Sequence, residues 1–79
     1  MVLLDELTYL ANLLKAAGIK TLMSDGSSTK MLVECDGLSY LITLDAVMDS
    51  LKLLDVKMST EVVSLTPEQA FFRITGKNV

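Results

Sequence analysis

Apolar and polar residues alternate on both sides of Asp36-Gly37, and this alternation predicts a β-hairpin in the middle of the chain. An Asp-Gly dipeptide between two apolar runs favours a two-residue type I′ turn, because both turn positions need a positive φ. This turn fixes an entirely apolar face that pairs Cys35 with Leu38, Val33 with Tyr40 and Met31 with Ile42. The other face then pairs Glu34 with Ser39, Leu32 with Leu41 and Lys30 with Thr43.

Residues 3–17 place apolar side chains at helical spacing, which predicts an amphipathic helix that packs through one stripe. Lys15 lies near its expected end, where it complements the helix dipole, and Gly18 is placed to end the helix in a left-handed conformation. Tyr9 and Leu13 fall outside the stripe. They are therefore candidates for a second contact surface.

Residues 19–24 alternate in polarity and predict a strand, and residues 25–29 have the composition of a turn. If the loop spans those five residues, Ile19 and Met23 join the apolar face of the central hairpin. A four-residue loop would place them on the other face. The expected sheet therefore contains at least three antiparallel strands.

After the hairpin, apolar residues recur at helical spacing and predict a second helix, with Leu44, Val47, Met48, Leu51 and Leu54 on one stripe. Thr43 is the expected N-cap, and Ile42 and Val47 would pack as a hydrophobic staple around it. Asp45 and Asp49 would project from one side of this helix. We expect a solvated acidic face there, not a cation site, because acidic residues commonly complement a helix N-terminus.

Residues 56–65 are rich in β-branched side chains, which predicts a further strand. In a regular strand, Val63 and Leu65 share one side and Val62 lies on the opposite one. Val62 would then share the less apolar face of the sheet with Leu32 and Leu41.

Residues 67–75 allow two structures. Thr66, Pro67 and Gln69 have the pattern of a helix start with a capping box, and Gly76 could end such a helix. The run of residues 71–75 is instead typical of a strand, which would form a hairpin with residues 56–65. We favour the hairpin slightly and keep the short helix as the alternative.

Together these elements predict one α+β domain over residues 1–79, in two layers, with the element order α-β-β-β-α-β-β. Both helices would cover the apolar face of an antiparallel sheet. The uncovered sheet face is the expected association surface. The interface candidates are Leu32, Leu41 and Val62 on the sheet, with Tyr9 and Leu13 on the first helix.

The composition favours association with another protein chain. Hydrophobic residues make up 51% of the 79 residues, and a domain this small buries only about 60% of its unfolded surface. We therefore expect a homodimer, or an unknown protein partner.

The 7 basic and 10 acidic residues give a net charge of −3, and the basic residues are scattered, which disfavours nucleic acid as a partner. We expect no membrane contact, because no segment has the roughly 18 consecutive apolar residues of a membrane span.

Side chains for catalysis or metal binding are scarce. The chain has no histidine and one cysteine, so we expect no catalytic residue, no metal and no cofactor. Cys35 lies on the apolar hairpin face, where we expect an inert thiol. A single cysteine fits a reducing compartment, and Asp5 and Glu6 interrupt the apolar run of a secretory signal. We therefore expect a cytoplasmic protein.

These patterns favour a small non-catalytic interaction or adaptor module that acts as a homodimer. The alternative is a small-ligand or anion-binding sensor that uses the loop from Ser24 to Lys30, with Gly26, Ser27, Ser28 and Lys30 as its candidates. That loop lacks the second glycine and the Gly-Lys-Ser/Thr ending of a phosphate-binding loop, so we favour a polar turn. Thermal-shift measurements with phosphate-containing metabolites would separate the two, because a ligand at about 100 times its Kd stabilises a sensor by about 2.7 kcal/mol.

Overall fold

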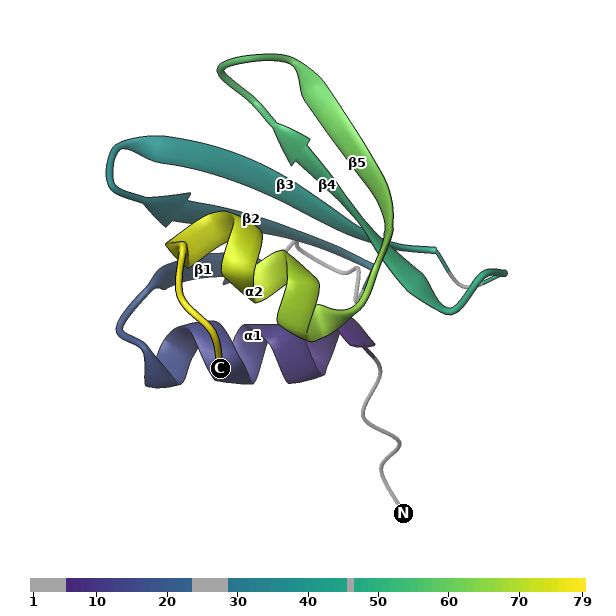
Figure 1. Cartoon of the computed structure of the whole chain (residues 1–79), viewed down its shortest axis with the longest axis horizontal. Helices are drawn as coiled ribbons and strands as arrows, with labels where there is room; N and C mark the ends of the chain where they lie inside the picture. Colours follow the sequence, from purple (N-terminus) through teal and green to yellow (C-terminus); the bar gives the residue numbers. More distant parts are fainter. Residues whose placement is uncertain (1–5, 24–28, 46) are drawn as a thin grey trace.

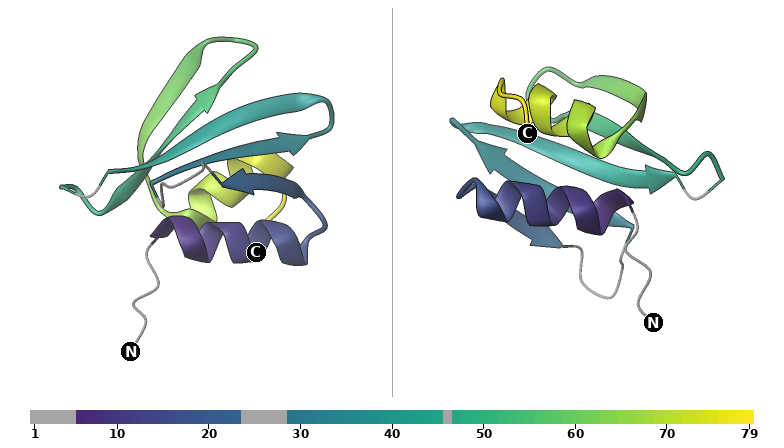
Figure 2. Two further views of the ribbon diagram at one scale, coloured as in Figure 1. Left: turned by 180° about the vertical axis from the view of Figure 1, so that it is seen from behind. Right: turned by 60° about the horizontal axis from the view of Figure 1, so that its bottom comes forward.

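The computed structural model of the protein describes residues 6–23, 29–45 and 47–79, which form one antiparallel five-stranded sheet and two helices (Figure 1). The elements are α1 (Glu6–Ala16), β1 (Lys20–Met23), β2 (Lys30–Cys35), β3 (Leu38–Asp45), β4 (Ser50–Asp55), β5 (Thr60–Leu65) and α2 (Pro67–Thr75). The strands lie side by side in sequence order. Both helices lie in front of the sheet in the right-hand view of Figure 2. The α+β class and the single antiparallel sheet are confirmed, and both observed helices contact the sheet.

The central hairpin has the predicted turn and the predicted register. Asp36 and Gly37 have φ angles of 52° and 77°, as a type I′ turn requires. All six predicted pairs between β2 and β3 are present. On the apolar face, Met31, Val33 and Ile42 are completely buried. We call the face that carries them the inner face and the opposite face the outer face.

Helix α1 ends as predicted. The Ile19 amide donates to the Leu14 carbonyl at 2.9 Å, and the Gly18 amide donates to the Lys15 carbonyl at 3.0 Å. These two bonds, with Gly18 at a φ of 78°, form the Schellman motif that leads the chain out of a helix. The expected stripe is confirmed where it is described, with Leu7, Leu10, Ala11 and Leu14 buried. Residues 3 and 4 of that stripe lie outside the described residues.

Strand β1 joins the sheet in one of the two registers that the loop length left open. Thr21 pairs with the buried Val33 and Ile19 packs against the core. The described side chains of this series therefore lie on the inner face, as the five-residue loop predicts. Residues 24–28 themselves lie outside the described residues.

The predicted second helix is wrong. Residues 43–45 continue β3 and residues 50–55 form β4. Leu51 and Leu53 are buried, two residues apart, and Leu54 lies on the outer face opposite Leu41. Leucines on both faces of one strand imitate helical spacing, because the apolar positions then no longer follow a strict period of two.

Thr43, the predicted N-cap, pairs with Lys52 within the sheet, and Asp45 closes a turn after β3 instead. One Asp45 carboxylate oxygen accepts hydrogen bonds from the amides of Val47 and Met48, at 3.1 and 3.2 Å, a common use of aspartate at the start of a turn. Asp49 then has a φ of 52°. Hence Asp45 and Asp49 share no helix face. The predicted staple is also absent, since Ile42 is buried while Val47 is 92% exposed.

The face assignment within β5 is corrected by a bulge. Val62 and Leu65 pair with the two buried leucines of β4 across an irregular register, and Ser64 has a φ of 60°. The extra residue brings both side chains to the inner face and turns Val63 outward. Val62 packs against the core and so does not lie on the outer face. A strict alternation cannot reveal such a bulge.

The C-terminal segment is the short helix α2, so the favoured hairpin is wrong and its alternative is confirmed. The Gln69 amide donates to the Thr66 hydroxyl at 3.1 Å, and the Thr66 amide donates to the Gln69 side-chain oxygen at 2.9 Å. This is the complete capping box. The helix ends at Gly76, which has a φ of 73°. Its buried residues are Pro67, Ala70, Phe71 and Ile74.

The two helices divide the inner face between them. Helix α1 contacts β1, β3 and β4, α2 contacts β4 and β5, and the two helices contact each other. Burial of each leucine, isoleucine or methionine that is completely buried there stabilises the fold by about 1.5–3 kcal/mol. Among the described residues, no helix covers the outer face (Figures 1 and 2). The element order is therefore α-β-β-β-β-β-α, and the described part of the chain leaves one side of the sheet open.

Candidate interaction surface

Four leucines stand in line across the outer face. Leu22, Leu32, Leu41 and Leu54 occupy directly paired positions on β1, β2, β3 and β4. Leu22 is 52% and Leu32 39% exposed, and the other two are half-buried. Because neighbouring strands lie about 4.8 Å apart, the line is about 14 Å long. We call these four residues the leucine row.

Mostly polar side chains border the leucine row on both sides. Two residues away along the strands lie Lys20, Glu34 and Ser39 on one side, and Lys30, Thr43 and Lys52 on the other. The Lys20 ammonium lies 3.8 Å from a Glu34 carboxylate oxygen, and both side chains are more than half exposed, so this pair adds little stability. An apolar centre inside a polar rim is the usual anatomy of a protein interface.

The structure brings together only part of the predicted interface set. Leu32 and Leu41 are paired on the outer face. Tyr9 is 40% exposed, but it lies on α1, in the other layer. Leu13 is half-buried on the same helix and packs against the core, as Val62 does from β5. These three residues are therefore not part of the leucine row.

The sequence analysis did not predict two members of the leucine row, Leu22 and Leu54. Leu22 alternates with Lys20 in its strand, so the outward position of its side chain was readable, but its partner depended on the loop length. Leu54 was assigned to a helix, because its apolar neighbours recur at helical spacing. Both residues become adjacent to Leu32 or Leu41 only through the registers of β1 and β4.

The predicted anion loop lies mostly outside the described residues. Gly26, Ser27 and Ser28 belong to the segment 24–28. Lys30 is exposed on β2 opposite Thr43, where it borders the leucine row. The sensor hypothesis stays a prediction.

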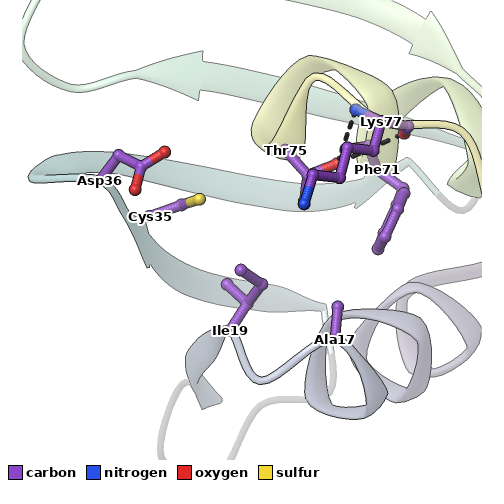
Figure 3. Close-up of a pocket in the computed structure, with 7 residues that line it drawn as sticks. All are labelled: Ala17, Ile19, Cys35, Asp36, Phe71, Thr75 and Lys77. Atoms are coloured by element: carbon purple, nitrogen blue, oxygen red, sulfur yellow. Dashed lines mark hydrogen bonds between the residues drawn. The ribbon is translucent and has the colours of Figure 1, made fainter.

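A hollow of about 180 Å³ opens where both helices end beside the β2–β3 turn, and Figure 3 shows the side chains around it. Its walls are formed by Ala17, Ile19, Cys35, Asp36, Phe71, Thr75 and Lys77. Cys35 is a half-buried free thiol. The Thr75 hydroxyl donates to the Phe71 carbonyl at 2.9 Å and accepts from the Lys77 amide at 3.1 Å. The Thr75 hydroxyl therefore stabilises the C-terminal end of α2. The hollow is a gap between the ends of the two helices and the β2–β3 turn.

Electrostatic and metal-binding features are few in the part of the chain that the structure describes. No three Asp, Glu or Cys residues of that part gather where they could hold a metal ion, and none of its helices is both long and apolar enough to cross a membrane. Burial raises the pKa of Tyr40 above 10.0, and the neighbouring Asp55 carboxylate raises this pKa further. Tyr40 lies on the inner face, away from the leucine row.

Comparisons with protein-family models, with curated proteins and with solved structures found no match. A functional proposal therefore has to rest on the molecule itself. The leucine row is the strongest basis, because four different strands place its apolar side chains together at the surface.

Proposed function

We propose that the protein is a small, non-catalytic interaction module that acts as a homodimer through the outer face of its sheet. The leucine row is the observation that supports this proposal. Leu22 and Leu32 alone expose 52% and 39% of their surface to water, and burial of apolar surface is the main driving force of protein association. The free Cys35 thiol fits a reducing, cytoplasmic compartment.

The size of the outer face indicates a weak dimer. Five strands spaced about 4.8 Å apart and about six residues long give a face of roughly 24 by 20 Å. A standard interface buries about 800 Å² on each partner, which would be about one sixth of the 5167 Å² surface of this protein. The outer face is smaller than that standard, so we expect a dissociation constant in the micromolar range.

Charged substitutions in the leucine row test the proposal. We expect the Leu32→Lys, Leu41→Lys double variant to be a folded monomer, because a dimer would have to bury several charges of one sign. In the monomer the long lysine side chains can turn their ammonium groups to water and so spare the fold. Size-exclusion chromatography with light scattering, from about 1 µM to 1 mM, measures the result, and circular dichroism checks that the variant is folded.

A matched control replaces two exposed apolar side chains outside the leucine row. Val47 and Met48 are 92% and 65% exposed in the β3–β4 turn, outside the leucine row. The Val47→Lys, Met48→Lys variant should dimerise like the wild type. A wild type that is monomeric over the whole concentration range, or a control that dissociates as readily as the leucine variant, would contradict the proposal.

A further inference from the structure

We infer that the second copy packs face to face with the two-fold axis along the leucine row, so that Glu34 of each copy meets Lys30 of the other. The inference rests on the proposed homodimer and adds its geometry. Glu34 and Lys30 lie on the same strand, β2, two residues to either side of Leu32. Rotation by 180° about an axis through Leu32 and across the strands exchanges these two positions.

The same rotation also matches the neighbouring strand. On β3, Ser39 and Thr43 lie two residues to either side of Leu41. The axis therefore places the hydroxyl of Ser39 opposite the hydroxyl of Thr43 from the other copy. Every leucine of the row meets its own counterpart. The centre of the contact is apolar, and the polar groups at its rim are complementary.

The spacing of two packed sheets allows Glu34 of one copy to reach Lys30 of the other. Facing sheets lie about 10 Å apart, a gap that a glutamate and a lysine can close from opposite sides. Glu34 is already 3.8 Å from Lys20 of its own chain. It would thus lie between two ammonium groups, one from each copy. The contact forms twice in the dimer, because the interface is isologous.

A second two-fold axis is compatible with the leucine row but offers no such pairing. An axis parallel to the strands, between β2 and β3, places Leu32 on Leu41 of the other copy. It sets Glu34 against Ser39 and Lys30 against Thr43, so no opposite charges meet. Charge complementarity between facing surfaces fixes orientation and register, and it favours the axis along the row.

One like-charged pair marks the boundary of this contact. Glu61 of β5 continues the row beyond Leu54, and the axis would place it opposite its own counterpart. The β4–β5 hairpin diverges from the β2–β3 hairpin towards their turns in Figure 1. The contact is therefore centred on β2 and β3, and Glu61 lies at its solvated edge, where repulsion is screened.

Charge reversal tests this geometry. Glu34→Lys makes the β2 flanks all positive and Lys30→Glu makes them all negative, so either variant alone should raise the dimer dissociation constant about tenfold or more. A mixture of the two variants should form a heterodimer with near wild-type affinity, because both contacts are then complementary. The double variant Glu34→Lys, Lys30→Glu should dimerise like the wild type. Sedimentation equilibrium measures each dissociation constant.

The matched control is Lys52→Glu. Lys52 borders the leucine row on β4 as Lys30 does on β2, but the axis places it opposite Val56, an uncharged residue. Its reversal should change the dissociation constant much less than Lys30→Glu. One set of results would contradict the axis but not the proposed function. In it, the wild type dimerises and the leucine variant does not, but Lys30→Glu and Lys52→Glu change the dissociation constant equally, and mixing the two β2 variants restores no affinity. A monomeric wild type would overturn both.

Discussion

The two faces of the sheet are built from the same strands and both carry apolar side chains, but the helices cover only one of them. Ile42 and Leu41 are consecutive residues of β3, as Val33 and Leu32 are of β2. Ile42 and Val33 are completely buried, whereas Leu32 is 39% exposed. An apolar side chain is therefore not enough to define the core. The helices α1 and α2 define it, because their apolar stripes cover one face only.

This difference suggests two separate roles for the leucines and isoleucines of the sheet. The inner face supplies the free energy that holds the fold together. The outer leucines add less to the stability of the folded monomer, because water still reaches part of each side chain. A surface with that property is available for association. Substitutions on the inner face should therefore lower stability, whereas substitutions on the outer face should mainly weaken dimerisation.

The largest expected effect compares two consecutive residues. Ile42→Ala should lower the free energy of unfolding by about 2–5 kcal/mol, because it leaves a cavity among completely buried neighbours. Leu41→Ala should cost the monomer clearly less. Denaturant unfolding, extrapolated to low protein concentration so that dimer dissociation does not contribute, measures both losses. Equal losses would show that the outer face is as closely packed as the inner face.

A second prediction concerns the turn that assigns each residue of β2 and β3 to its face. Gly37→Val should lower the free energy of unfolding by about 1–3 kcal/mol, because a β-branched residue is strained at a φ of 77°. An added Cβ atom meets no atom within 4 Å, so the loss reports backbone strain and not a clash.

Gly37→Asn is the matched control for the turn, since asparagine tolerates the left-handed region. It should cost clearly less than valine in the same denaturant measurement. If the two variants unfold at the same denaturant concentration, the positive φ does not hold the register, and the division into two faces has another cause.

The smallest expected effect is a pH dependence that belongs to the inner face. Burial and Asp55 raise the pKa of Tyr40 above 10.0, so the unfolded chain loses this proton at a lower pH than the folded protein does. Above about pH 10 the folded state therefore binds more protons, and the unfolding free energy falls as the pH rises. Below that value the stabilisation is fully present.

Two variants isolate this titration. Tyr40→Phe should remove its share of the stability loss between about pH 9 and 11 in denaturant unfolding. Tyr9→Phe leaves Tyr40 as the only phenol, because the chain has two tyrosines, and ultraviolet absorbance then follows Tyr40 alone. A midpoint at or below 10 would contradict the burial of Tyr40 on the inner face.

Local sequence determined the elements whose signals lie within a few residues. Asp36-Gly37 sets the turn and the register of β2 and β3, because only a few residue types accept two consecutive positive φ angles. The apolar stripe and Gly18 likewise set α1 and its end. In the C-terminal segment, the capping box of Thr66 and Gln69 was visible, but the strand-forming composition of residues 71–75 competed with it.

The tertiary structure decided the features that depend on neighbouring strands. The bulge at Ser64 moves Val62 to the inner face, which alternation along one strand cannot show. Leu51 to Leu54 become a strand because β3 and β5 pair with them and the helices bury Leu51 and Leu53. Leu22 and Leu54 join the leucine row only through cross-strand registers. A single chain segment encodes which side chains are apolar, but the surface they form depends on which strands pair and which face the helices cover.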